Sequence, residues 1–323
     1  MTDAPTAQDV RSGQRRALGK AITLIESHRP EDEAAGQALL QELLPHTGNS
    51  VRIGITGSPG VGKSTFIEAF GMLLTAAGHR VAVLAVDPSS PVAGGSILGD
   101  KTRMETLSRH PDAFIRPSPS GKALGGVARR TQESRLLCEA AGYDVVIIET
   151  VGVGQSEYEV ASMVDFFLVL MLPSAGDELQ GIKKGIMELA DALVINKADG
   201  DTAQVALQTQ RQYASAVHLF SHDPDWTPPV LTCSALEGTG LEEIWETAQR
   251  YVAGARESGR FEGRRTDQQL HWFRSLTSAM LEATLDQDEA VRRVRTELEA
   301  QVRGGELSPY LAAERVVGML RNR

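Results

Sequence analysis

The chain has 323 residues, 41% hydrophobic and 23% charged, an ordinary composition for a globular protein that can bury its core without metal or disulfide staples. Its formal net charge of −9 has no long block of like charge, which argues against non-specific nucleic-acid binding. No run approaches the ~20 apolar residues of a membrane span, and the N-terminus lacks the apolar core of a secretory signal, so we expect a cytoplasmic protein whose two cysteines are buried thiols.

The N-terminal residues 1–48 predict a helical extension. A first helix is indicated by apolar residues spaced four and three apart, namely Leu18, Ile22 and Ile25. Pro30 separates them from a second run, Ala38, Leu39, Leu43 and Leu44. We see no chemistry in this extension.

Residues 49–254 predict a doubly wound α/β domain. Short apolar runs alternate with helical stretches, and several runs are apolar on both faces, which is typical of a mostly parallel sheet covered by helices. The predicted strands are Val51–Thr56, Val81–Val86, Ala113–Arg116, Asp144–Glu149, Phe166–Leu172, Leu193–Asn196 and Val230–Cys233.

The strands stop after about residue 254, and residues 255–323 predict a helical tail. Its helices are marked by apolar faces at Leu270–Leu281 and Val291–Val302. Gly304 and Gly305 interrupt them, and Ser308-Pro309 restarts a last helix as N-cap and first-turn proline. We expect this tail to be an oligomerisation arm.

The first predicted strand runs into a match to G-x-x-x-x-G-K-[ST] and then into a helix. In such a loop the glycines let the backbone N–H groups surround phosphates at a helix N-terminus. Lys63 would reach the β- and γ-phosphates, and the Ser64 hydroxyl would bind Mg²⁺. The predicted phosphate-binding residues are Gly57, Ser58, Pro59, Gly60, Val61, Gly62, Lys63, Ser64 and Thr65.

The base is predicted from the tetrapeptide Asn196-Lys197-Ala198-Asp199, which ends an apolar strand, where α/β sheets place ligand loops. The Asp199 carboxylate can accept hydrogen bonds from the ring N–H and the exocyclic amine of guanine, a donor pair that adenine lacks. The sequence therefore predicts GTP and GDP as ligands. The loop after the next strand would brace the base with Ser234, Ala235 and Leu236.

Acidic residues at strand ends are candidates for holding magnesium. Glu149 ends an apolar strand in E-x-x-G, and the Gly152 N–H after it can face the γ-phosphate. Asp87 and Asp100 are two further candidates, with turn capping as the alternative for both.

The glutamine that orients water in Ras-like GTPases has no counterpart here, because Val153 follows Gly152 and the nearest glutamine is Gln155. We therefore predict slow intrinsic hydrolysis that a partner or mobile loop accelerates. Candidate switches are 88–103, 149–157 and 173–185. Five polar side chains are candidates for completing the hydrolysis site, and each could instead be a solvated surface residue: Arg103, Arg129, Gln180, Lys183 and Lys184.

Longer segments are more specific than a generic GTPase would share, including GITGSPGVGKST, VAVLAVDPSS, GGSILGDKTRM, ETVGVGQSE and LVLMLPSAGDELQGIKKGI. These segments make the chain resemble, over nearly its whole length, the MeaB family of SIMIBI-class P-loop GTPases, which are chaperones of methylmalonyl-CoA mutase. The resemblance implies that Asp87, Asp100 and Glu149 surround magnesium. It also implies a third switch at 172–183 that contains Gln180 and Lys183.

The same resemblance implies a homodimer joined by the C-terminal helices. It further implies that the partner is an adenosylcobalamin-dependent acyl-CoA mutase, whose cofactor loading the chain gates and which it protects. One alternative is a kinase that uses the same loop on a small molecule or transport protein. Another is a metallochaperone GTPase, although the sequence holds no His- or Cys-rich tract.

Overall fold

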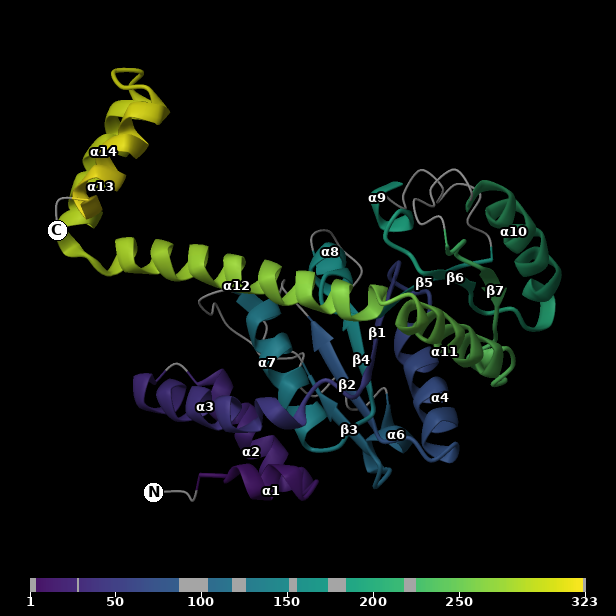
Figure 1. Ribbon diagram of the computed structural model, residues 1–323. Helices are drawn as coiled ribbons and strands as arrows, with labels where there is room; N and C mark the ends of the chain where they lie inside the picture. The colour runs from purple at the N-terminus through teal and green to yellow at the C-terminus, as the bar shows by residue number, and fades with distance from the viewer. Residues whose placement is uncertain are drawn as a thin grey trace. The chain divides into compact units, whose positions relative to one another are not determined.

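The computed structural model describes residues 4–27, 29–86, 104–117, 126–150, 156–173, 184–217 and 225–321. Its centre is a seven-stranded sheet in the order β3-β2-β4-β1-β5-β6-β7, and every pairing among these strands is parallel (Figure 1). The strands are β1 (Val51–Gly57), β2 (Val81–Val86), β3 (Ala113–Arg116), β4 (Val145–Thr150), β5 (Phe166–Met171), β6 (Ala192–Ile195) and β7 (Val230–Thr232). All seven predicted strands are thus confirmed within a residue or so at each end.

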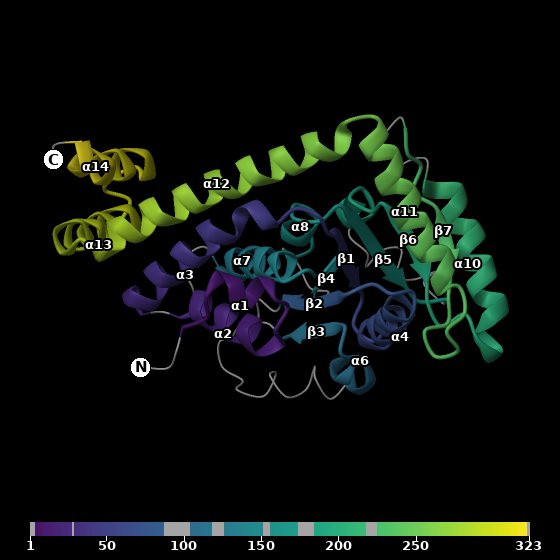
Figure 2. The ribbon, with the colours of Figure 1, turned by 60° about the horizontal axis from the view of Figure 1, so that its bottom comes forward.

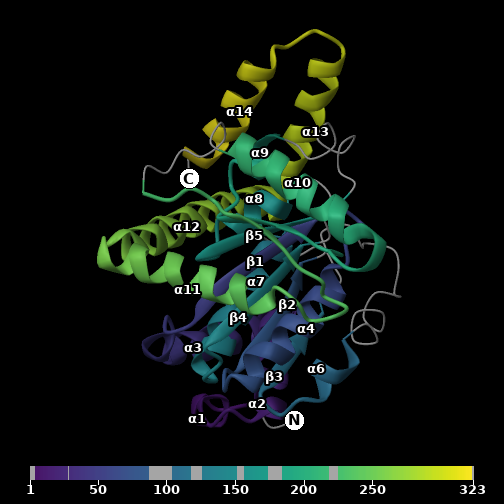
Figure 3. The same cartoon turned by 90° about the vertical axis from the view of Figure 1, so that its right-hand side faces the viewer.

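One face of the sheet packs on α4 (Lys63–Ala76), α6 (Glu105–Arg109) and α11 (Leu241–Glu257). Ile53 and Ile55 of β1 and Val145 and Ile147 of β4 point to this face, where they join the main apolar cluster with Phe66 and other α4 residues. Figure 3 shows α4 and α11 beside each other on this side. Because side chains alternate along a strand, each residue between those named points to the opposite face.

The opposite face packs on α7 (Gly126–Ala140) and α8 (Ser156–Ala161), which Figure 2 shows across the sheet from α4. At Gly54 of β1 an added Cβ would lie 3.0 Å from Val160 of α8 and 2.7 Å from Phe167 of β5. Only glycine lets α8 approach the strand this closely. Along the chain, α9 (Lys184–Met187) lies between β5 and β6, and η3 (Gly200–Thr202) and α10 (Ala203–Ala216) lie between β6 and β7.

The N-terminal helices α1 (Ala7–Arg11), α2 (Arg15–Glu26) and α3 (Pro30–Leu43), with η1 (Leu44–His46), contact α7. The predicted face of the first helix is confirmed, since Leu18, Ile22 and Ile25 are buried. The predicted face of the second is partly wrong: Ala38 and Leu44 are exposed, and Leu40 is buried instead. The buried row follows the α-helical spacing 36, 39, 40 and 43.

The C-terminal helices are α12 (Arg260–Gln287), α13 (Glu289–Arg303) and α14 (Pro309–Arg321). The Leu311 N–H donates to Ser308 Oγ, as the predicted N-cap requires. The chain divides into two compact units, Met1–Gln268 and Gln269–Arg323, so α12 begins in the first and continues into the second. The predicted domain limits at 48 and 254 stay predictions.

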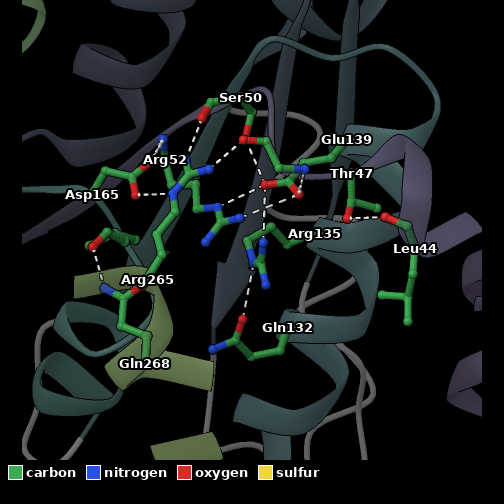
Figure 4. Close-up of polar contacts among 12 residues, drawn as sticks. Leu44, Thr47, Ser50, Arg52, Gln132, Arg135, Glu139, Asp165, Arg265 and Gln268 are labelled. Carbon is green, nitrogen blue, oxygen red and sulfur yellow. Dashed lines mark hydrogen bonds and ion pairs between the residues drawn. The ribbon is translucent and has the colours of Figure 1, made fainter. Parts of the chain in front are cut away.

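The start of α12 is fixed to the amino edge of the sheet by a buried polar network (Figure 4). Arg265 donates to both carboxylate oxygens of Asp165, at 2.8 and 2.6 Å, and to the Ser50 carbonyl at 2.6 Å. On the neighbouring side Arg52 and Arg135 converge on Glu139 of α7, at 2.8 and 3.0 Å. The network therefore joins the first turns of α12 to β1, β5 and α7.

Both cysteines are buried free thiols, as predicted. Among the described residues, no helix combines the length and apolar character needed to cross a bilayer.

Candidate nucleotide-binding site

The predicted phosphate loop connects the carboxyl end of β1 to the N-terminus of α4. Gly57, where β1 ends, passes so close to β5 that an added Cβ would lie 2.6 Å from the Leu170 carbonyl oxygen. Gly60 and Gly62 have φ angles of +84° and +94°, which side chains disfavour. The glycines are therefore required by the path of the loop, and the backbone N–H groups at the start of α4 are available to an anion.

Lys63, the first residue of α4, folds its side chain back over this loop. Its ammonium donates to the Gly57 carbonyl at 2.7 Å and to the Ser58 carbonyl at 3.4 Å. Burial lowers the pKa of Lys63, and the charges of Glu149 and Glu157 oppose that shift. The ammonium is thus held at the mouth of the loop, where a phosphate group can replace the carbonyls as its partner.

Glu149 lies near the carboxyl end of β4, in register with Ile55 of β1. It follows Val145 and Ile147 along the face that packs on α4, so its carboxylate shares that face with the first turn of α4, which carries Ser64. A hydroxyl and a carboxylate are hard oxygen ligands of the kind magnesium takes, and these two residues fit the predicted metal site. Asp87, Asp100, Gly152, Gln180, Lys183 and Arg103 lie outside the described residues.

Asn196 joins the predicted base loop to the phosphate loop. Its side chain is 1% exposed and donates to the Val61 carbonyl at 2.8 Å. Lys197 makes a second link, donating to the Gly60 carbonyl at 2.8 Å. Lys197 is also the one non-glycine residue with positive φ, 59°, in the described part of the chain, and this conformation turns the backbone so that Asp199 follows at the edge of the sheet.

The loop after β7 lies beside these residues. Ser234 Oγ donates to the Asp199 carboxylate, and the Ala235 N–H donates to Asn196 Oδ1 at 3.2 Å. Leu236 is 81% exposed. The structure therefore brings the two predicted base-binding segments together, with the carboxylate of Asp199 oriented by a serine.

Sequence reasoning missed two polar side chains at this edge. The Cys233 thiol lies 3.4 Å from Asn196 Oδ1, and Glu157 of α8 is buried. Cys233 could have been found from the sequence because it directly precedes Ser234 of the predicted base loop. The spacing of Glu157 three residues before the apolar Val160 was the signal for the second.

Arg129 was a candidate for supplying charge to the reaction, with a solvated side chain as the alternative. It is neither free nor solvated: it is 8% exposed and pairs with Glu33 of α3 at 2.7 Å and Glu133 of α7 at 3.1 Å. Lys184 begins α9.

The parallel sheet, the glycine-rich loop that leads from β1 into α4, and the Asn-Lys-x-Asp loop at the same edge define a P-loop GTPase. Residues 18–290 match the family described as methylmalonyl Co-A mutase-associated GTPase MeaB. The chain belongs to the MeaB family.

Known relatives agree with this assignment. GTPase ArgK of Escherichia coli is 50% identical, over 95% of this chain and 93% of its own. The mouse protein named methylmalonic aciduria type A homolog, mitochondrial, is 45% identical, over 96% of this chain and 78% of its own. A crystal structure described as LAO/AO transport system kinase superposes with a TM-score of 0.79 at 42% identity, covering 98% and 96% of the two chains. The protein is therefore a GTPase of a mutase-associated family, as the sequence predicted.

Proposed function

We propose that this GTPase is a nucleotide-dependent chaperone of an adenosylcobalamin-dependent acyl-CoA mutase of the methylmalonyl-CoA mutase type. In this role it gates loading of the cofactor and protects the mutase from inactivation. The observation that carries the proposal is the match of residues 18–290 to a mutase-associated GTPase family. The intact phosphate loop and its lysine support a cycle of binding and hydrolysis rather than a purely structural nucleotide.

The proposed nucleotide contacts are supported by the path of the phosphate loop and the position of Lys63. The N–H groups from Gly60 to Thr65 and the Lys63 ammonium hold the β- and γ-phosphates, and Asp199 accepts from the guanine ring. Ser64 and Glu149, with Asp87 and Asp100, would hold Mg²⁺, which when bound neutralises charge on the phosphate oxygens. Gly152 contributes its N–H to the γ-phosphate.

The link to the mutase is a coupling between two binding events. Segment 172–183, with Gln180 and Lys183, is the third switch that signals to the mutase. Such coupling commonly amounts to about 1–3 kcal/mol and is reciprocal for binding, so the mutase must change nucleotide affinity when the nucleotide changes mutase affinity. Hydrolysis is slow until the partner completes the site.

The test is GTP turnover with and without a purified cobalamin-dependent mutase. We expect phosphate release to rise when the mutase is added, and GDP and a non-hydrolysable GTP analogue to give different mutase affinities. The superposable crystal structure described as LAO/AO transport system kinase suggests a second candidate, a kinase. Phosphate transfer from GTP to a small amine, without stimulation by any mutase, would favour that candidate.

A further inference from the structure

Glu157 is a buried carboxylate that the proposed nucleotide contacts leave without a role. Its side chain is 1% exposed, whereas Tyr158 and Glu159, the next two residues of α8, are exposed. Charged side chains are seldom buried to this degree unless a partner compensates them. The position of Glu157 on α8 identifies what it faces.

The register of α8 on the sheet places Glu157 under the phosphate loop. Val160 packs on Gly54 of β1, and Glu157, one turn earlier, lies on the same side of the helix. Because α8 returns from the carboxyl end of β4 toward the start of β5, that turn lies about 4.5 Å nearer the carboxyl edge. This is the level of Thr56, just before Gly57.

Two hydrogen bonds at this level connect the α8 face of the sheet with the phosphate loop. Thr56 and Thr150 point to the α8 face at this level, and their hydroxyls are joined by a 2.7 Å hydrogen bond. The next residue, Gly57, accepts a hydrogen bond from the Lys63 ammonium. Consistently, the charge of Glu157 is one of two carboxylate charges that oppose the lowering of the Lys63 pKa by burial.

We propose that Glu157 is a positioning residue of the nucleotide site, whose buried carboxylate competes with the nucleotide phosphates for the Lys63 ammonium. Attraction between unlike charges holds Lys63 near the strand ends when no phosphate is bound. The same carboxylate repels the β-phosphate, so it weakens retention of the nucleotide. Since Glu157 belongs to α8, nucleotide affinity then depends on the position of this helix. The inference rests on the proposed binding of phosphates by Lys63.

The experiment compares GDP affinity in three variants by calorimetry. Glu157→Gln removes the buried charge and should tighten GDP binding by about threefold to tenfold, the range expected for one charge in a partly dry site. Glu157→Asp keeps the charge and should stay near the wild type. Glu159→Gln removes an equal charge from an exposed position of the same helix and should change affinity less than twofold.

GMP is the internal control for the mechanism, because it lacks the β-phosphate that Lys63 reaches. Competition with GMP should give equal affinity in the wild type and Glu157→Gln, whereas structural damage would weaken both ligands. If Glu157→Gln does not fold, as judged by thermal unfolding, Glu157→Leu replaces it as the neutral variant. A neutral variant that binds GDP no more tightly than Glu159→Gln overturns the inference. A wild type that binds no GDP overturns the proposed nucleotide site instead.

Discussion

At the scale of single residues, the Asn196 side chain uses both ends of its amide. Its amide nitrogen donates to Val61 in the phosphate loop, and its oxygen accepts from Ala235 and lies within reach of the Cys233 thiol. An added Cβ at Gly62 would lie 3.0 Å from the same amide nitrogen. A buried amide satisfied on both sides has one orientation, so the phosphate loop and the predicted base loop are fixed relative to each other.

Asp199 carries the first prediction. Asp199→Asn substitutes an amide N–H₂ for one of the oxygens that we propose accept from guanine, so we expect the preference to shift from GTP toward xanthosine triphosphate, whose exocyclic oxygen accepts a hydrogen bond. Turnover measured with both nucleotides in competition tests this. Asp201→Asn, an exposed acid two residues further on, is the control, and an unchanged guanine preference in Asp199→Asn would contradict the assignment.

At the scale of elements, two consecutive arginines of α12 pair with the aspartates that precede two strands. Arg264 pairs with Asp191 before β6 at 3.4 Å, and Arg265 pairs with Asp165 before β5. Each aspartate also accepts a backbone N–H, from Phe167 and Arg52 respectively. The first turns of α12 are therefore held by bonds that reach into the sheet itself.

The buried pair of Arg265 with Asp165 is the anchor of α12. Removing one of its members should lower the free energy of unfolding much more than removing a surface ion pair. Arg265→Met leaves the Asp165 carboxylate, which is 2% exposed, without its guanidinium partner, and we expect a loss of about 3–5 kcal/mol in the free energy of unfolding. Urea unfolding followed by tryptophan fluorescence measures it. Arg295→Met, whose pair with Asp286 is exposed, should cost less than about 1 kcal/mol; equal losses would contradict the anchor.

The lowered pKa of Glu139 of α7 allows a prediction of how the stability of the protein depends on pH. Burial raises its pKa, but the guanidinium groups of Arg135 and Arg52 outweigh burial and lower the pKa to about 2, against an ordinary value of 4.5. The unfolded chain then takes up this proton at higher pH than the folded one. The resulting stability, on the order of 3 kcal/mol, is complete above about pH 4.5 and is lost as pH falls toward 2.

Urea unfolding at pH 5 and pH 3 measures that loss. Glu139→Gln should be less stable at pH 5 and should show a smaller difference between the two pH values than the wild type. Glu42→Gln, on an exposed position of α3, should keep the wild-type difference. An undiminished difference in Glu139→Gln would assign the acid sensitivity to other carboxylates.

At the scale of the whole molecule, the C-terminal unit exposes several large apolar side chains. On α12, exposed apolar residues recur at Leu270, Phe273, Met280 and Leu281, a helical spacing that lines one side. Within the same unit, α13 and α14 with the end of α12 form an open groove of about 490 Å³ lined by residues such as Leu298, Val302 and Val317. Exposed apolar side chains that line one side of a helix are typical of subunit contacts.

The predicted oligomerisation arm can be tested on that surface. If residues 255–323 join two chains, the double variant Phe273→Asp and Leu281→Asp should convert a dimer into a monomer, since burying two carboxylates at a contact is unfavourable. Light scattering after size exclusion gives the mass. Intrinsic GTP turnover should remain, because the nucleotide site lies in the other unit. A monomeric wild type would exclude this arm as a dimer contact.

The sequence by itself determined the features that local spacing encodes. Short apolar runs between helical stretches predicted the seven strands, and the phosphate loop was identified because its residues are contiguous. The prediction of the buried face of α3 was partly wrong, because Ala38, Leu39, Leu43 and Leu44 also fit a helical spacing. Only packing against α7 selects Leu40 as a buried residue.

Only the tertiary structure decided which distant residues meet. Asn196 and Val61, 135 residues apart, come together because the sheet order sets β5 between β1 and β6. The same order and the packing of α8 on Gly54 bury Glu157, and the pairing of Arg265 with Asp165 spans 100 residues. Strand order and helix packing are set by the free energy of the whole fold, and residue spacing within one segment carries no record of them.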